Sequence, residues 1–338
     1  MGSEVYDVAW AELFIRATLV WDAHAGIFPD PDADLSGLPE WTAAGMDYVS
    51  INVGFDVLDW PETKRTLIGY RRQLEAMKSV VIIKTIADID SARAAGKLAV
   101  SFDIEGVNAL NGDIGMIAQY HDLGVRQMLF AYNLNNMGAG GCHDDDTGLS
   151  AFGKAAVSEM NRVGMIVDCS HVGRKSTLEI IDYAQKPVVF THSNPVALCD
   201  HQRNIHDDQI KACAQSGGVV GVNGMGIFLG DNDISTKTFA NHVCYIADLV
   251  GPEHVGFGLD YKPAQKHAPD LGTILRSRPD YWPVGQKYDT RGIKLFTPQS
   301  MADVVAILKY RGWSDADLRG YLGGNFRRVA TSIWNVEN

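Results

Sequence analysis

A short apolar run followed by an amphipathic helical pattern recurs along this chain, and this recurrence limits the fold more than any other feature. Eight such runs occur, at residues 18–21, 48–52, 98–104, 127–132, 165–168, 187–191, 219–223 and 254–258. Between them lie stretches such as 66–80 and 153–164, whose apolar spacing is typical of helices that pack on a sheet. Eight alternations predict an α/β fold of the (β/α)8 TIM-barrel type, because doubly wound sheets more often contain about six strands.

The C-terminal segment predicts additional helices. Thr297 precedes Pro298, a pair that favours a helix start, and Ser314 with Asp317 forms a second capping pattern. We expect these C-terminal helices to close the outside of the barrel. Residues 262–296 are polar, proline-rich and weakly periodic, which predicts a long loop. The composition contains no linker that would divide the chain, so residues 1–338 are predicted to form a single barrel domain.

The charge balance excludes two classes of partner. The chain carries 41 acidic and 30 basic residues, a net charge of −11, and no run rich in lysine and arginine. We therefore expect small-molecule partners and neither nucleic acid nor a membrane surface. The chain lacks a signal-peptide pattern and an apolar run of ~18 residues, so a soluble, cytoplasmic protein is expected. Five cysteines without a CxxC pair indicate reduced thiols. Whether copies of the chain associate into a homo-oligomer is left open.

Reactive side chains follow several of the predicted strands, at the ends where barrels of this type carry their chemistry. The set comprises Asp22, His24, Glu105, Tyr132, Asn133, His171, His192 and Asp260. Histidine and carboxylate side chains on one rim supply the nitrogen and oxygen donors that zinc prefers, with a position left for water. The pattern predicts a catalytic metal site.

Other polar residues have simpler explanations. Asp103 shares a strand face with Glu105, but carboxylates at strand ends commonly cap loops, so we leave Asp103 out of the site. The acidic run 143–148 lacks the ligand spacing of an EF-hand and predicts a solvated loop. Surface exposure is the expected explanation for the remaining histidines, which are His121, His143, His201, His206, His242, His254 and His267.

Several segments resemble the membrane (renal) dipeptidase family of the amidohydrolase superfamily, in its soluble bacterial form. They are "DAH" (22–24), "DIEG" (103–106), "AYNLNNMGAGG" (131–141), residues 148–173 ending in "SHVG", residues 187–205 containing "FTHSN" and "HQRNI", "HVGFGLDY" (254–261) and "GGNFRRV" (323–329). The resemblance implies an amidohydrolase-type barrel with two zinc ions bridged by Glu105, one of them held by His171 and His192. The other ion would use His24 and an acid two residues later, where this chain has Gly26.

The same resemblance implies roles for further residues. Arg203 would bind the carboxylate of the substrate, because a planar guanidinium matches a planar anion. Asp260 would lie near the substrate's α-amino group and move a proton from the attacking water to the leaving amine. Catalysis is thus assigned to Glu105 and Asp260. Animal members have a histidine in the segment after the fourth strand, whereas this chain, like many bacterial relatives, has Tyr132 and Asn133, which we expect to bind substrate.

Gly26 leaves the number of metal ions open. Glu105, His171 and His192 suffice for one tight zinc site. A second ion would have only His24 and a share of Glu105 unless Asp22, Asp260 or the substrate contributes, so we expect it to be weak or absent. Replacing Gly26 by aspartate is expected to raise the affinity for this second ion.

The expected function is hydrolysis of the amide bond of a dipeptide, or of a related small substrate with a carboxylate, by a metal-activated water. Two alternatives remain. One is a metal-dependent amidase or lactonase-type hydrolase of a specialised pathway, since loss of a ligand favours more reactive substrates. The other is a catalytically silent barrel, which the glycine at position 26 alone suggests.

Overall fold

Eight parallel strands form a ring in this protein, whose computed structural model describes residues 6–263 and 271–334. The strands are β1 (Trp21–Ala25), β2 (Tyr48–Phe55), β4 (Leu98–Glu105), β5 (Val125–Leu129), β6 (Ile166–Asp168), β7 (Val188–Val189), β8 (Val220–Val222) and β9 (Val255–Phe257). One sheet runs in the order β1-β2-β4-β5-β6-β7, and β8 pairs with β9. Each of the eight apolar runs found in the sequence overlaps one of these strands.

Backbone contacts close the ring at its two open edges. A parallel bridge between Phe190 and Val220 joins β7 to β8. The amide of Asp260 donates to the carbonyl of His24 at 3.0 Å, and the amide of Gly26 donates to the carbonyl of Tyr261 at 3.1 Å. These bonds join the end of β9 to the end of β1, so the predicted α/β barrel is confirmed.

A ninth strand, β3 (Val80–Ile82), pairs with β4 outside the ring and was not predicted. It begins at Val80, the last residue of the helical pattern at 66–80, and the helix itself ends at Ala76. A run this short has no periodicity of its own, so it cannot be separated from the helix before it.

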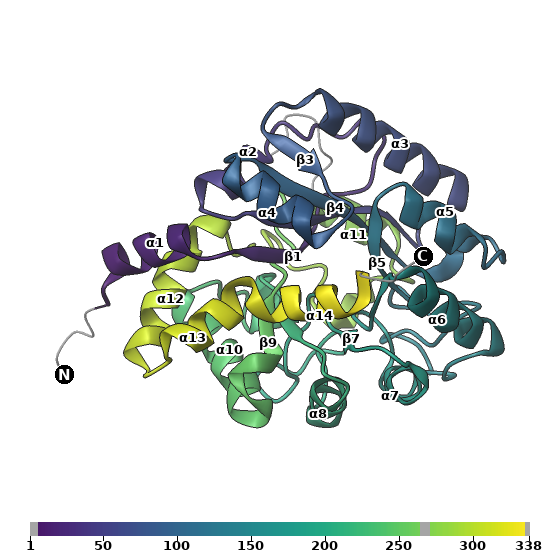
Figure 1. The fold of residues 1–338 in the computed structure, drawn as a ribbon. Coiled ribbons are helices and arrows are strands. Elements are labelled where there is room, and N and C mark those ends of the chain that lie inside the picture. The colour runs from purple at the N-terminus through teal and green to yellow at the C-terminus, as the bar shows by residue number, and fades with distance from the viewer. Residues whose placement is uncertain (1–5, 264–270, 335–338) are drawn as a thin grey trace.

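Helices surround the strands (Figure 1). They are α1 (Val8–Ala17), α2 (Pro39–Ala43), α3 (Trp60–Ala76), α4 (Ile86–Ala94), α5 (Met116–Asp122), α6 (Ala151–Val163), α7 (Arg174–Tyr183), α8 (Asp207–Gln215), α9 (Gly226–Leu229), α10 (Thr236–Val250), α11 (Leu271–Ser277), α12 (Met301–Tyr310), α13 (Asp315–Arg319) and α14 (Asn325–Trp334). The predicted cap of α13 is present, since Ser314 Oγ accepts from the Asp317 amide at 3.1 Å. Pro298 instead begins a 3-10 turn that precedes α12.

The last helix covers the N-terminal end of the barrel. Phe326 and Val329 of α14 pack with Trp21 and Tyr48, the first residues of β1 and β2. Figure 1 shows α14 crossing the ring of strands. The expectation that all C-terminal helices lie outside the barrel is therefore wrong for α14. The apolar side chains at this end of the ring need cover from water, and the apolar face of α14 provides it.

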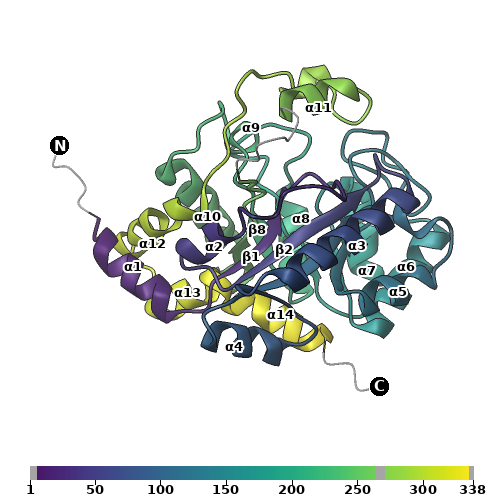
Figure 2. The ribbon, with the colours of Figure 1, turned by 90° about the horizontal axis from the view of Figure 1, so that it is seen from above.

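The segment predicted as a long loop contains helical turns and lies at the opposite end from α14, as α11 does in Figure 2. Leu275 and Trp282 from this segment pack against Phe55 and Phe228 near the C-terminal ends of the strands. Residues 264–270 lie outside the described part of the chain. The described part of the segment covers the end of the barrel where the reactive residues were predicted.

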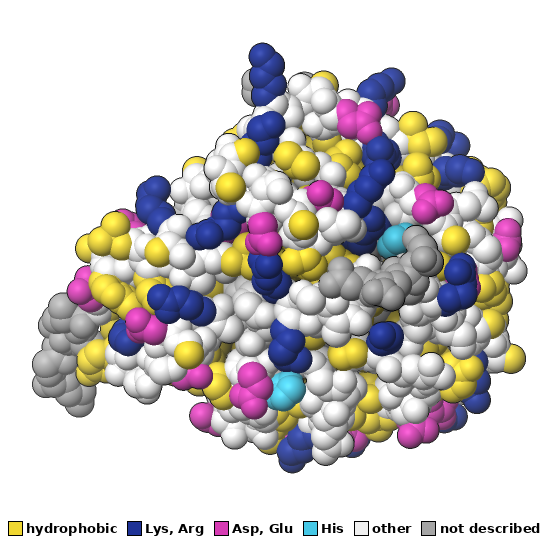
Figure 3. All heavy atoms as spheres, in the orientation of Figure 1, with side chains coloured by type: hydrophobic (Ala, Val, Ile, Leu, Met, Phe, Trp, Pro, Cys, Tyr) yellow, Lys and Arg dark blue, Asp and Glu magenta, His cyan; other side chains and the backbone are white. Residues whose placement is uncertain are grey.

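The surface agrees with the mixed charge of the sequence. On the face drawn in Figure 3, basic and acidic side chains are interspersed. Within residues 6–263 and 271–334, no helix is long and apolar enough to cross a bilayer. All five cysteines are free thiols.

Candidate metal centre and active site

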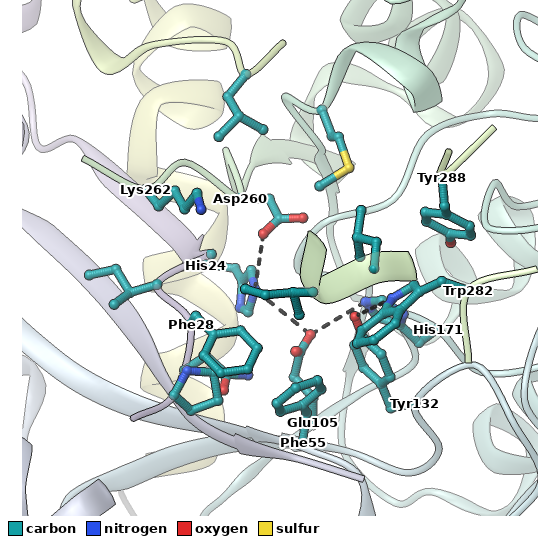
Figure 4. Close-up of a pocket in the computed structure, with 18 of the residues that line it drawn as sticks. His24, Phe28, Phe55, Glu105, Tyr132, His171, Asp260, Lys262, Trp282 and Tyr288 are labelled. Carbon is teal, nitrogen blue, oxygen red and sulfur yellow. Dashed lines mark hydrogen bonds and ion pairs between the residues drawn. The ribbon is translucent and has the colours of Figure 1, made fainter. Parts of the chain in front are cut away.

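The carboxylate of Glu105 lies at the centre of three histidine side chains. Its Oε1 atom is 3.2 Å from His192 Nε2, 3.4 Å from His171 Nε2 and 3.7 Å from His24 Nε2. Figure 4 shows His24, His171 and Glu105 around one cavity. Glu105 Oε1 is buried and has no hydrogen-bond partner in the described structure. The strand-end pattern therefore brings together all four residues predicted as metal ligands.

Each histidine comes from a different part of the ring. His24 belongs to β1, Glu105 ends β4, and His171 and His192 follow β6 and β7. Asn133, His171 and Asp260 have positive φ angles of 63°, 65° and 52°. Non-glycine residues adopt this conformation at an energetic cost and cluster at functional sites when they do. The backbone at these strand ends is thus shaped to turn side chains into the cavity.

The second nitrogen of each imidazole ring faces a hydrogen-bond acceptor. His24 Nδ1 lies 3.3 Å from Asp103 Oδ1, and His171 Nδ1 lies 2.6 Å from the amide oxygen of Asn133. His192 Nδ1 lies 2.7 Å from Thr191 Oγ1, whose own proton goes to Asp168. In the neutral form of each ring, which is the form that binds metal, these acceptors place the proton on Nδ1 and leave a lone pair on Nε2. All three Nε2 atoms lie beside Glu105.

This arrangement fits a bound metal. His171 Nε2 and His192 Nε2 are 3.1 Å apart, and two lone pairs at that distance repel each other unless a cation lies between them. Donors ~2.1 Å from one tetrahedral zinc are themselves about 3.4 Å apart, close to the separations found around Glu105 Oε1. Donor atoms of His24, Glu105 and His192 all lie within 4.8 Å of one another.

Burial and neighbouring charges set the protonation of these side chains. Burial holds the pKa values of His171 and His192 well below the ordinary histidine value, so both rings are neutral, the form that binds metal. Burial also lowers the pKa of His24, but the carboxylates beside it, Asp103 first among them, raise that pKa to about 10. Burial raises the pKa of Glu105 to about 8, although the charge of His24 opposes this effect. A buried glutamate ionised at neutral pH therefore needs a nearby cation.

Asp260 is a further carboxylate beside the three histidines. Its Oδ1 atom is 3.7 Å from His24 Nε2, and its Oδ2 accepts a hydrogen bond from Asn223 Nδ2 at 3.1 Å. His24 Nε2 is thus equally distant from Asp260 Oδ1 and Glu105 Oε1. One nitrogen and two carboxylates converge on this side of the cavity.

The position that a side chain on Gly26 would take is already filled by Asp260. A Cβ built on Gly26 would overlap Asp260 Oδ1 and would lie 2.7 Å from the Asp260 carbonyl oxygen. The expectation that an aspartate at position 26 fits and supplies a missing ligand is wrong for this backbone. The carboxylate of Asp260 already occupies the space into which that side chain would extend.

Asp22 does not complete the site. Trp41 Nε1 donates to its Oδ2 at 2.8 Å, and the Leu259 amide donates to its Oδ1 at 2.9 Å. The pairing of β1 with β2 shifts register between Asp22 and Ala25, which interrupts the regular alternation of faces expected from the sequence. Asp22 therefore ties β1 to its neighbours, and its Oδ1 also accepts from the His24 backbone amide at 3.4 Å, so both oxygens already have partners.

Arg203 is buried beside His192. Its Nη2 donates to the His192 carbonyl at 2.8 Å and its Nη1 to Ser193 Oγ at 3.0 Å, while Nε has no partner. Only 2% of Arg203 is exposed, and within the described part of the chain no carboxylate forms an ion pair with it. A buried guanidinium without an acid is costly unless a ligand supplies the anion.

Tyr132 and Asn133 contact His171 in different ways. The Tyr132 ring stacks on the His171 ring with centroids 4.2 Å apart, and Tyr132 lines the cavity. Asn133 is fully buried, with its oxygen on His171 and its nitrogen on the Tyr281 carbonyl at 2.9 Å. The side chain of Asn133 thus orients the His171 ring and has its main hydrogen bonds within the protein.

Sequence reasoning missed two groups that orient the histidines. Asp103 was set aside as a loop cap, yet it accepts from His24 Nδ1, and its position two residues before Glu105 was the available signal. Thr191, immediately before His192, forms the matching contact with His192. Metal-bound histidines usually donate their second ring N–H to a carboxylate or a similar acceptor. A second acid on the same strand face as a predicted metal ligand therefore indicates such an acceptor.

Two histidines predicted to be exposed are buried. His201 and His242 are 3% and 1% exposed, with Nε2 atoms 2.7 Å from the Gln286 carbonyl and 2.9 Å from the Leu229 carbonyl. Their hydrogen bonds tie loops together, which a helical or loop pattern in the sequence does not reveal. His267 lies outside the described residues.

A comparison with protein families identifies the group to which this chain belongs. The sequence model of membrane dipeptidase, peptidase family M19, matches residues 40–278. The chain belongs to the membrane dipeptidase family. The match includes Glu105, His171, His192, Arg203 and Asp260, and it confirms the family resemblance seen in the sequence.

Individual relatives agree with the membrane dipeptidase assignment. An uncharacterized dipeptidase of Schizosaccharomyces pombe, C965.12, is 35% identical over 53% of this chain and 46% of its own length. Dipeptidase aclJ of Aspergillus oryzae is 28% identical over 76% of this chain and 57% of its own length. The chain thus spans about half the length of these curated relatives. The crystal structure of an amidohydrolase from Pseudomonas aeruginosa matches with a TM-score of 0.85 and 26% identity, covering 96% of this chain and 99% of that one.

Proposed function

We propose that this protein is a zinc-dependent hydrolase of the dipeptidase type, which cleaves the amide bond of a dipeptide or a related small substrate with a free carboxylate. The observation that carries the proposal is the convergence of three histidine Nε2 atoms on the unpartnered Oε1 of Glu105. Membership of the membrane dipeptidase family supports both the metal and the reaction.

Two sets of ligands are available. Glu105, His171 and His192 would hold one ion, and Glu105, His24 and Asp260 would hold a second. The second set differs from the sequence expectation, because Asp260 supplies the carboxylate that position 26 lacks. Zinc bound to such donors lowers the pKa of a coordinated water to about 7 and polarises a substrate carbonyl.

Asp260 is proposed to carry the proton of the reaction. Asn223 holds Oδ2, so Oδ1 is the oxygen that faces the cavity. Oδ1 would accept a proton from the attacking water as the C–O bond forms, and return it to the nitrogen as the C–N bond breaks. Asp103, Asn133 and Thr191 act as positioning residues, because each fixes the ring of one histidine ligand.

Arg203 is proposed to bind the carboxylate of the substrate. Its burial without an acid partner makes it the expected anion site beside the metal centre. Tyr132 would contact the substrate from the cavity wall.

A substrate panel with zinc-reconstituted protein tests the function. Dipeptides, N-acyl amino acids and lactones are compared by initial rate, and hydrolysis of dipeptides with a free C-terminal carboxylate is expected to be fastest. Faster hydrolysis of lactones or N-acyl amino acids than of dipeptides would support the alternative amidase or lactonase function. Stoichiometric zinc binding without hydrolysis of any substrate in the panel would indicate a catalytically silent barrel.

A further inference from the structure

Four aromatic side chains form one side of the active-site cavity and take no part in the metal centre as ligands. They are Phe28, Phe55, Tyr132 and Trp282, and we call them the aromatic wall. Ring centroids are 5.5 Å apart for Phe28 and Phe55, 5.2 Å for Phe55 and Tyr132, and 6.1 Å for Tyr132 and Trp282. All three pairs meet edge to face, and Figure 4 shows the four rings around Glu105.

The aromatic wall is separate from the core that stabilises the barrel. Phe55 and Trp282 belong to a small apolar cluster at the C-terminal ends of the strands, with Phe28 and Tyr132 packed against it. The cluster gathers side chains from distant parts of the chain, including the segment that contains Leu275 and Trp282. An apolar cluster beside a polar metal centre is typical of a pocket that binds an apolar part of a ligand.

A buried polar group beside the wall also lacks a partner. Asn52 lines the same cavity, is 2% exposed, and its Nδ2 has no hydrogen-bond acceptor in the described structure. Its Oδ1 accepts from the Gly54 amide at 2.9 Å, which fixes the orientation of the side chain. A buried donor without an acceptor indicates that a ligand supplies one.

Phe55 of the wall and Arg203 belong to opposite sides of the ring of strands. Phe55 ends β2, with Phe28 after β1 and Tyr132 after β5 on either side of it, whereas Arg203 donates to the His192 carbonyl and to Ser193 Oγ, both after β7. In the sheet order, β7 is separated from β2 by β4, β5 and β6. A substrate whose carboxylate reaches Arg203 therefore extends its other end, the acyl side of the amide, toward the aromatic wall.

We infer that the aromatic wall is the subsite for a bulky apolar group, above all an aromatic one, on the acyl side of the scissile amide. This inference rests on the proposed function, which places the carboxylate at Arg203. Edge-to-face packing on several rings favours an aromatic group over an aliphatic one of similar size. Such a group can be the side chain of an N-terminal residue or an N-acyl group without an amine.

Four substrates test the inference and separate these two sources. Phe-Ala is compared with Ala-Ala, Gly-Ala and N-(3-phenylpropanoyl)-alanine in the zinc-loaded protein. The kcat/KM for Phe-Ala is expected to exceed that for Gly-Ala on the order of a hundredfold. Equal or higher kcat/KM for the phenylpropanoyl compound identifies an N-acyl group as the preferred source, and a lower value identifies a side chain.

Trp282 is the residue to change, because Tyr132 stacks on a metal ligand and Trp282 does not. Trp282→Ala is expected to reduce the Phe-Ala to Gly-Ala ratio at least about tenfold, and Trp282→Phe to restore most of it. Trp10→Ala is the matched control, since Trp10 is half-buried on α1 and does not line the cavity. Zinc content and circular dichroism establish that each variant is folded and loaded.

Product binding tests the inference without turnover. Calorimetry with the zinc-loaded protein is expected to show tighter binding of phenylalanine than of glycine, with the difference reduced in Trp282→Ala. Hydrolysis without an aromatic preference, or equal affinity for phenylalanine and glycine, would overturn the subsite. A protein that hydrolyses no amide but binds phenylalanine preferentially would retain the subsite and lose the proposed function.

Discussion

The carboxylate of Asp260 occupies the space into which a side chain at position 26 would extend, and its Oδ1 atom lies 3.7 Å from His24 Nε2. Backbone hydrogen bonds from β1 to the end of β9 bring Gly26 and Asp260 this close. Because position 26 is a glycine, the carboxylate of Asp260, which follows β9, can lie next to His24 of β1. Gly26 and Asp260 together therefore determine which carboxylate faces His24.

Substitution of Gly26 is expected to weaken the binding of the second metal ion. Gly26→Ala and Gly26→Asp both place atoms where Asp260 lies, so each should lower the affinity for this ion by about ten- to a hundredfold. Competition between the protein and a chromogenic chelator measures the affinity. Gly285→Ala is the control, because an added Cβ there meets nothing within 4 Å. Tighter binding in Gly26→Asp would restore the expectation drawn from the sequence.

Asp103→Asn tests whether Asp103 positions His24. The neutral amide loses the charge that holds the Nδ1 proton, so zinc affinity should fall by about ten- to a hundredfold while the fold is retained. The same chelator competition gives the affinity, and circular dichroism reports the fold. Asp182→Asn, an exposed change on α7, is the matched control. Unchanged zinc affinity in Asp103→Asn would show that Asp103 contributes only to packing and does not position His24.

Arg203→Met should raise KM for substrates that carry a carboxylate. A charged contact in a buried site is worth about 1.5–3 kcal/mol, which corresponds to a loss of roughly 10- to 150-fold in binding. The C-terminal amides of the same dipeptides lack the anion and should lose little. Steady-state kinetics on matched acid and amide pairs measures the difference. A similar loss for both members of a pair would assign Arg203 a purely structural role.

The barrel and its reactive rim were accessible from the sequence because both depend on local patterns. Apolar runs of a few residues mark the strands, and the residue after each run lies at the C-terminal end of the ring. Glu105, His171 and His192 therefore came together as expected. The position of α14 was missed because the sequence shows that a helix is amphipathic but not which surface it covers.

The surroundings of His24 were not accessible in the same way. Gly26 looked like a missing ligand because the sequence does not show how closely β9 approaches β1. The role of Asp22 was equally hidden, since its bonds to Trp41 and Leu259 join segments far apart in the chain. Closure of the ring decides which carboxylate faces His24, and this closure depends on the whole fold.

Metal content per chain tests the central claim most directly. After dialysis against zinc and then buffer, elemental analysis of the unmodified protein is expected to give about two zinc ions per chain, since two ligand sets share Glu105. Glu105→Gln removes the shared charge and should reduce the content to well below one, whereas Glu75→Gln, an exposed change on α3, should leave it unchanged. Circular dichroism of each variant establishes that the fold is intact. An unmodified protein without zinc, or a Glu105→Gln variant that keeps the full content, would contradict the account.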